Sequence, residues 1–162
     1  MHKRIAMAAI EPLLLETLAA GGEVTLTVTG VSMRPMLRHG EDRIVLKSHD
    51  GRALKKYELP LYCRADGRYV LHRIVGVKRT ADGVRYTALG DNQTAKEHGI
   101  TPDRIVGIAV AWQRGTQYYP CSGIRYGLYC RLWYHTLILR RIYRGGKRIL
   151  RIVLKKNGDH KA

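Results

Sequence analysis

Short runs rich in β-branched residues, each followed by a turn signal, fill the chain between Gly22 and Pro120. The first run alternates valine and leucine with threonine from position 24 to 29, which is typical of a half-buried strand. Asp-Gly pairs separate several of the runs, and such pairs favour hairpin turns. Because no helical period intervenes, we expect a mainly β domain of antiparallel strands, barrel-like or sandwiched. The further strands are predicted at 43–46, 59–63, 69–78, 84–89 and 104–112.

The N-terminal residues 1–22 are predicted to form a short helix that begins near Pro12 and ends at Gly21-Gly22. Glu11, Pro12 and Glu16 interrupt the apolar run of this segment. A secretory signal needs a short uninterrupted apolar block, and a membrane-spanning helix needs about 20 apolar residues, so neither is predicted. The side chains expected to face the core are Leu13, Leu14, Leu18 and Ala20.

Residues 121–162 are predicted to form a basic amphipathic tail of one or two helices, which leaves residues 23–120 as the β-domain. Apolar residues recur in the tail at three- and four-residue steps, with arginines between them. The tail holds 11 Lys/Arg and one acidic residue, whereas residues 1–120 hold 18 and 12, so +10 of the net +16 lies in the tail. Such a field favours anionic partners, whether phospholipid, nucleic acid or acidic protein.

The three cysteines, Cys63, Cys121 and Cys130, form no CxxC pattern and accompany no histidine cluster. The spacing therefore predicts neither a metal site nor a disulfide framework, and no cofactor is expected. A reducing compartment is the simpler interpretation.

The segment 29–37 contains a candidate nucleophile. A strand runs into Gly30, Ser32 follows two residues later, and Pro35 then rigidifies the chain. Such a turn leaves backbone N–H groups outside the sheet, so it can present both a hydroxyl and oxyanion donors. Taken alone, the pattern is also that of an ordinary turn serine.

A candidate general base lies in the strand predicted at 69–78. Strand periodicity places His72 on the face of Val70 and Ile74, with Arg73 on the opposite face. The ordinary histidine pKa of about 6.5 suits a general base near neutral pH. A lone histidine in an apolar strand is more often a satisfied core residue, so this segment too is ambiguous alone.

The turn Gly90-Asp91-Asn92 supplies a candidate orienting acid. Asp91 is expected to accept the second ring N–H of His72 and so hold its tautomer.

Together these segments resemble the ordered motifs of the signal peptidase I family and its S24/S26 relatives, which include the LexA-type self-cleaving repressors. The resemblance covers residues 24–112. The segments that carry it are Gly30-Val31-Ser32-Met33-Arg34-Pro35, Leu71-His72-Arg73-Ile74-Val75, Leu89-Gly90-Asp91-Asn92 and Arg104-Ile105-Val106-Gly107.

The resemblance implies a LexA/signal-peptidase-like β-domain and a serine-type endopeptidase that uses a Ser–His dyad. Ser32 would be the nucleophile and its backbone N–H an oxyanion donor, while His72 would act as general base and then acid. Asp91 would orient His72, with Asp103 as the alternative, and Met33 and Pro35 would contact the substrate. A histidine at the base position is similar to the endoplasmic-reticulum, archaeal and some Gram-positive enzymes, since most bacterial ones have lysine.

The chain departs from the family pattern in three places. Gly30 stands where many signal peptidases have a serine that helps the oxyanion hole, and Tyr57-Glu58 replaces a Gly-Asp before the middle strand. The N-terminal membrane helix that tethers signal peptidases is not predicted here.

We therefore expect an endopeptidase that trims a small set of precursors with signal- or leader-like peptides, in the cytoplasm or peripherally on a membrane. Residues 124–156 are expected to contact an anionic leaflet, with Leu132, Trp133 and Leu139 inserted at the interface. In the competing interpretation the tail docks on the domain through Leu128, Leu132 and Leu139.

The alternative function is a non-catalytic β-domain that acts as a binding module, whose basic tail binds anionic membrane or nucleic acid. A DNA-binding repressor is disfavoured because only 31 residues precede Ser32, too few for a helix-turn-helix domain. Binding of nucleic acid without sequence preference is less favoured than membrane contact. The aromatic residues it would use are Tyr126, Tyr129, Trp133, Tyr134 and Tyr143.

Overall fold

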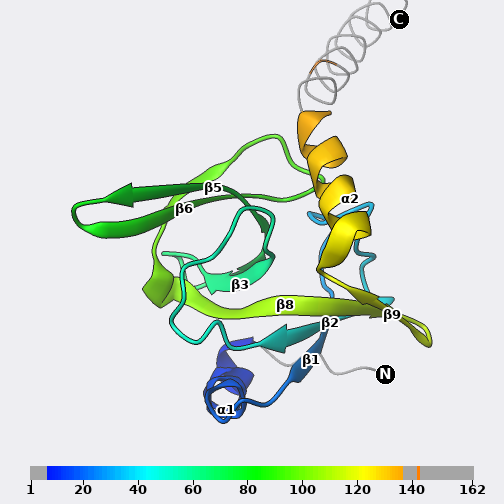
Figure 1. The fold of residues 1–162 in the computed structure, drawn as a ribbon. Helices are drawn as coiled ribbons and strands as arrows, with labels where there is room; N and C mark the ends of the chain where they lie inside the picture. Colours follow the sequence, from blue (N-terminus) through cyan, green and yellow to red (C-terminus); the bar gives the residue numbers. More distant parts are fainter. Residues whose placement is uncertain (1–6, 137–141, 143–162) are drawn as a thin grey trace, which may run out of the picture.

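The computed structural model describes residues 7–136 and residue 142. It is mainly β, as predicted, with antiparallel strands in two sheets and a helix near each end of the described chain (Figure 1). In chain order the elements are α1 (Met7–Ala19), β1 (Val24–Thr27), β2 (Asp42–Lys47), β3 (Pro60–Cys63), β4 (Tyr69–Leu71), β5 (Arg73–Thr80), β6 (Gly83–Leu89), β7 (Glu97–Ile100), the 3-10 helix η1 (Pro102–Arg104), β8 (Ile105–Arg114), β9 (Gln117–Pro120) and α2 (Gly123–His135).

The larger sheet is built around β8, whose first five residues are all buried. Its strand order is β1-β2-β8-β3-β4, and β9 also pairs with β8. On one edge of β8 lies β2, and on the other lie β3 and then β9. Register shifts interrupt both the β2–β8 and the β3–β8 ladders, as β-bulges do where a sheet curls. Figure 1 shows β8 crossing the molecule, with α1 and β1 on one side and the smaller sheet on the other.

The smaller sheet has the order β5-β6-β7. The strands β5 and β6 form a hairpin whose turn falls at Asp82-Gly83, as the sequence predicts, and the hairpin projects from the body (Figure 1). At its inner end, Ala88 of β6 pairs with Glu97 of β7. The strands β7 and β9 were not predicted.

The strand predicted at 69–78 is divided at His72. The first part, β4, pairs with β3 in the larger sheet, and the second, β5, pairs with β6 in the smaller one. Because the chain passes between sheets here, residues 72–75 are all buried and the expected alternation does not hold. Arg73, expected on the opposite face from His72, is 2% exposed and lies inside the protein.

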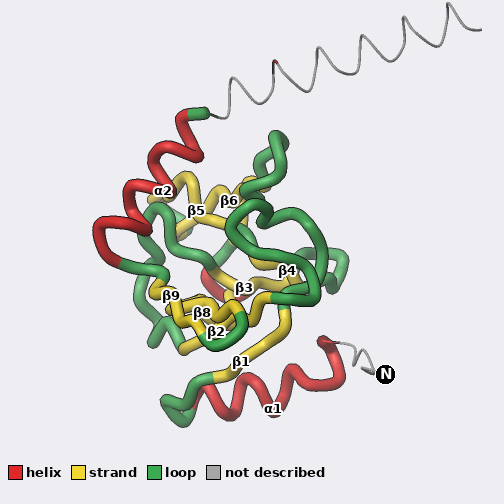
Figure 2. Tube along the Cα trace, turned by 90° about the vertical axis from the view of Figure 1, so that its right-hand side faces the viewer, coloured by secondary structure: helices red, strands yellow, loops and turns green. Residues whose placement is uncertain are grey.

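The helix α1 begins earlier than predicted, because Pro12 lies inside it and not at its start. Leu14 and Leu18 are buried in the larger of the apolar core clusters, as expected. Leu13 and Ala20, in contrast, are exposed. Figure 2 shows α1 packed beside β1 at the edge of the larger sheet.

The helix α2 docks on the domain, but not through the leucines that the sequence suggested. Cys130 is fully buried, and Tyr126 and Tyr129 pack against the core. Leu128 and Leu132 are instead exposed, and Leu139 lies outside the described residues, as do 137–141 and 143–162 of the predicted tail. Within the described part of the chain, no helix is long and apolar enough to cross a bilayer.

Candidate functional site

His72 lies at the junction of the two sheets, where it is 1% exposed. Its Nδ1 lies 2.8 Å from Oε1 of Glu97. Its Nε2 is buried and has no hydrogen-bond partner among the described residues. One side of the imidazole is therefore anchored to a carboxylate, and the other is buried without a partner in the described part of the chain.

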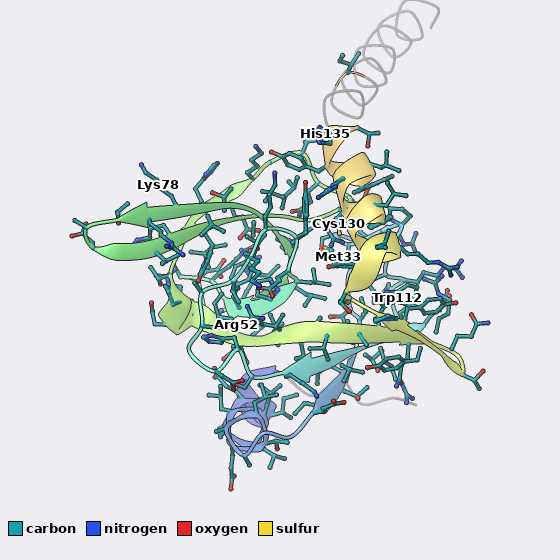
Figure 3. The ribbon with its side chains drawn as sticks, in the orientation of Figure 1. Met33, Arg52, Lys78, Trp112, Cys130 and His135 are labelled. Atoms are coloured by element: carbon teal, nitrogen blue, oxygen red, sulfur yellow. The ribbon has the colours of Figure 1, made fainter. Side chains whose placement is uncertain are left out.

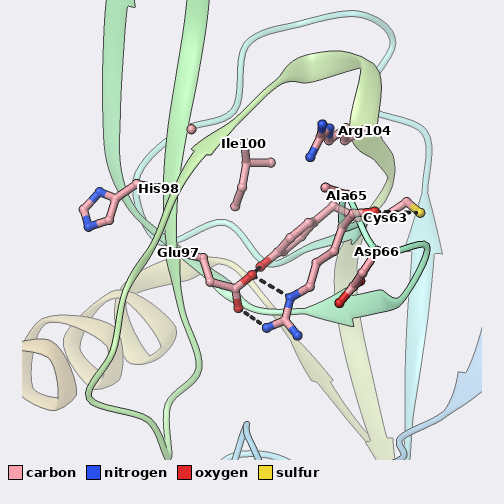
Figure 4. Close-up of a pocket in the computed structure, with 10 residues that line it drawn as sticks. Cys63, Ala65, Asp66, Glu97, His98, Ile100 and Arg104 are labelled. Atoms are coloured by element: carbon pink, nitrogen blue, oxygen red, sulfur yellow. Dashed lines mark hydrogen bonds and ion pairs between the residues drawn. The ribbon is translucent and has the colours of Figure 1, made fainter.

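Glu97 is held in place by two further side chains. Tyr62 donates its hydroxyl to Oε2 over 2.9 Å, and Arg64 donates Nε to the same oxygen over 2.7 Å and a second N–H to Oε1 (Figure 4). Burial opposes ionisation of Glu97, but these hydrogen bonds outweigh it and hold the pKa of its carboxyl below the usual value. The carboxylate is therefore ionised at neutral pH where it meets His72.

The environment of His72 favours the neutral imidazole. Burial lowers the pKa of His72 below its ordinary value, and the Glu97 carboxylate opposes that shift without cancelling it. With Nδ1 donating to Glu97, the neutral ring carries its lone pair on Nε2. A neutral imidazole of fixed tautomer is the form in which histidine accepts a proton.

Glu97→Gln tests the role of this carboxylate. In the peptide cleavage that the sequence leads us to expect, His72 acts as a base only when neutral. The wild-type rate should therefore rise with pH and level off below the ordinary histidine pKa of about 6.5. The substitution removes the charge that raises the pKa of His72, so the acidic limb should move to lower pH. The maximal rate should fall by about 10²–10⁴-fold, because the imidazolium formed during catalysis loses its counter-charge. The measurement is the pH–rate profile.

Glu41→Gln is the matched control, since Glu41 sits in an exposed ion pair with Arg38. Its profile should overlay that of the wild type. A Glu97→Gln profile that keeps both the wild-type limb and the wild-type rate would show that Glu97 does not orient His72.

Ser32 is half-buried in the turn after β1, and the Gly90–Asn92 turn packs on its backbone. The N–H of Asn92 donates to the Ser32 carbonyl over 2.6 Å, and Asn92 Nδ2 donates to the Val31 carbonyl. A Cβ on Gly90 would lie 2.8 Å from the Ser32 carbonyl oxygen, so only glycine allows this approach. The backbone N–H of Ser32 donates no hydrogen bond within the described residues.

Gly30, the departure from the family pattern, has a positive φ of 88° and donates its N–H to Nδ1 of His39. This conformation favours glycine over serine at position 30. The groups that this turn could offer to an oxyanion are therefore backbone N–H groups.

Asp91 forms a buried ion pair with Arg73, the neighbour of His72. Its two carboxylate oxygens accept from Nε and a terminal N–H of Arg73 over 2.9 and 2.7 Å. Tyr129 of α2 also donates to this carboxylate, and Trp133 donates its indole N–H to the Asp91 carbonyl. The expectation that Asp91 orients His72 is thus corrected, because the carboxylate at Nδ1 belongs to Glu97.

Arg73 connects the parts of the site to one another. Besides Asp91, it donates to Sδ of Met36 over 3.0 Å, to the hydroxyl of Tyr126 over 2.6 Å and to Sγ of Cys130 over 2.9 Å. Met36 belongs to the same turn as Ser32, and Tyr126 and Cys130 belong to α2. The Ser32 turn, the Gly90–Asn92 turn and α2 therefore meet at the residue next to His72.

The remaining predicted site residues lie elsewhere. Met33 is 3% exposed and packs in the apolar core, so it is not an exposed substrate contact, whereas Pro35 is exposed. Asp103 is exposed in η1, where the neighbouring Thr101 lowers the pKa of its carboxyl. Ser32 and His72 share the neighbourhood of Arg73, but the Ser32 hydroxyl does not hydrogen-bond Nε2 in this structure.

A cavity of about 350 Å³ opens beside the Glu97 network, lined by Tyr62, Arg64, His98 and Arg104 among others (Figure 4). Within residues 7–136 and 142, no group of three or more His, Cys, Asp or Glu side chains is arranged to hold a metal ion. All three cysteines are free thiols.

Comparison with known proteins yields no assignment: no protein-family model matches the chain, and no curated protein matches it.

Proposed function

We propose that the chain is a serine endopeptidase of the signal-peptidase type, with Ser32 as nucleophile and His72 as general base. The observation that supports this most directly is the state of His72: Nδ1 meets an ionised carboxylate, and the buried Nε2 has no partner within the described residues. A histidine that serves only the core has both ring nitrogens satisfied. An unpartnered Nε2 opposite an anchored Nδ1 is the arrangement a general base needs.

The reaction would run in two halves. Nε2 of His72 takes the proton of the Ser32 hydroxyl as Oγ bonds to the carbonyl carbon of the scissile peptide. The N–H of Ser32 donates to the oxyanion, and Glu97 stabilises the imidazolium. His72 then protonates the leaving amine and the C–N bond breaks, leaving an acyl-enzyme. Water, deprotonated by His72, attacks the ester, and Ser32 leaves with its proton restored.

The contact between Ser32 and His72 is expected to form when substrate binds. Catalytic hydrogen bonds are often long or absent without substrate and tighten in the complex. The site is prepared for this step, since the Gly90–Asn92 turn holds the Ser32 backbone while the Asp91–Arg73 pair fixes that turn beside His72.

The proposed substrates are precursors that carry a signal- or leader-like peptide, which the motif order around Ser32 and His72 suggests. The test is a synthetic peptide library incubated with the purified full chain and analysed by mass spectrometry. Ser32→Ala is the inactive variant and Ser48→Ala, at another half-buried loop serine, is the control. The proposal is supported if the wild type and Ser48→Ala cleave the peptides and Ser32→Ala does not. It is refuted if Ser32→Ala gives the same products as the wild type.

A binding module without catalysis is the second candidate function. It is favoured by one observation, the exposed apolar residues on α2, a helix that adjoins the site.

A further inference from the structure

The helix α2 exposes a row of large apolar side chains on the face turned away from the protein. Ile124, Leu128 and Leu132 are 89%, 56% and 59% exposed, and their four-residue spacing aligns them along one side of the helix. The opposite side docks on the domain through Tyr126, Tyr129, Cys130 and Trp133. Figure 3 shows side chains of α2 both toward the sheets and away from them. We call Ile124, Leu128 and Leu132 the outer stripe.

Positive charge borders the outer stripe on both sides. At about 100° per residue, Arg125 falls on one flank of the stripe and Arg131 on the other, and both are exposed. The sequence that follows adds nine more Lys/Arg between 137 and 162 and one acidic residue. An apolar strip edged by cations is the composition of helices that lie in the plane of an anionic membrane.

The same features argue against other occupants. A second copy of the chain, or its own basic segment 137–162, would bring like charges against Arg125 and Arg131. Non-specific nucleic-acid binding depends on aromatic rings exposed for base stacking. The aromatic residues of α2 that would serve are engaged with the domain. Tyr126 and Tyr129 bond to Arg73 and Asp91, and Trp133 bonds to the Asp91 carbonyl. Tyr134 packs against Val75 and Leu89 and accepts a hydrogen bond from Lys96.

We propose that the outer stripe of α2 binds an anionic membrane surface, with Ile124, Leu128 and Leu132 inserted among the acyl chains and the flanking arginines at the headgroups. The sequence led us to expect Trp133 to insert into the lipid as well. Trp133 instead donates its indole N–H to the Asp91 carbonyl, so it is not available to the lipid.

This surface has a consequence for the proposed peptidase, and this step rests on that proposal. The face of α2 opposite the stripe contacts Asp91, so about one helix diameter, 10–12 Å with side chains, separates the lipid from the Asp91–Arg73 pair. Membrane binding would therefore hold the site close to the bilayer, where a precursor emerging from the membrane presents its cleavage site.

The experiment is flotation of the purified full chain with lipid vesicles. One set contains phosphatidylcholine alone, and the other has part of it replaced by phosphatidylglycerol. The wild type should float with the second set and less so as salt rises, because salt screens the arginines. A variant with Ile124→Ser, Leu128→Ser and Leu132→Ser should partition about 10-fold or more weakly, since it loses the apolar area.

Leu13→Ser is the matched control, because Leu13 is 67% exposed on the other helix, α1. Its flotation should equal that of the wild type. Undiminished flotation of the triple variant, absence of wild-type binding to phosphatidylglycerol, or tighter binding to an oligonucleotide than to vesicles would each overturn the proposal. Ser32→Ala should float like the wild type, so a failed protease test and a failed membrane test remain distinguishable.

Discussion

Ser32→Ala is expected to lower the rate of peptide cleavage by about 10⁴-fold or more, because no other group replaces the attacking hydroxyl. Thermal unfolding should change little, since the Ser32 hydroxyl makes no hydrogen bond within the described residues and the turn is held by backbone contacts. The measurement is initial cleavage rate on a peptide taken from the library, with the melting temperature recorded in parallel.

His72→Ala should lower the cleavage rate by a similar factor. The double variant with both Ser32→Ala and His72→Ala should be no slower than either single variant. Groups that act as a unit lose their joint effect when one is removed. A double variant slower than both by the product of the two effects would contradict the proposed pairing of Ser32 with His72.

Asp91→Asn is expected to cause the largest loss of stability, about 3–5 kcal/mol, because it leaves the Arg73 guanidinium buried without its counter-charge. Both side chains of the pair are 3% exposed, so water does not compensate. Urea unfolding followed by circular dichroism gives the free energy of unfolding.

Asp66→Asn removes a carboxylate from the exposed pair with Arg68 and should leave the unfolding midpoint nearly unchanged. Adding Arg73→Met to Asp91→Asn should recover part of the lost stability, since it removes the uncompensated charge. If Asp91→Asn unfolds at the same urea concentration as the wild type, the pair does not stabilise the site.

Much of the fold was predictable because the local signals agree with one another. Alternating valine and threonine predicted β1, and Asp82-Gly83 predicted the β5–β6 turn. The strand β7 was missed because it is four residues long, contains Gly99 and shows no clear alternation. The division at His72 could not be predicted, since residues on both sides of it have the composition of one strand.

The acidic residue beside His72 illustrates what sequence alone leaves open. Asp91 and Glu97 are both acidic residues shortly after β6, and either could reach a histidine by chain position. The choice depends on the β6–β7 pairing, which sets Glu97 opposite Ala88, and on Arg73, which takes the Asp91 carboxylate. Both are contacts between segments distant in sequence, so no local pattern reports them.

The docked face of α2 was ambiguous for a related reason. Apolar residues occur on both sides of this helix, so its periodicity predicts a helix without saying which side packs. The structure turns the aromatic side inward because Arg73 and Asp91 need hydrogen-bonding partners that Tyr and Trp supply and Leu does not.

The central claim is that Ser32 and His72 together cut peptide bonds in native precursors. The most direct measurement compares new protein N-termini, by mass spectrometry, in cells that make the intact chain, Ser32→Ala or His72→Ala, each variant shown to be folded by thermal melting. We predict a set of termini that appears with the intact chain and is missing in both variants. Identical termini in all three would contradict the claim and leave the binding module as the function of this chain.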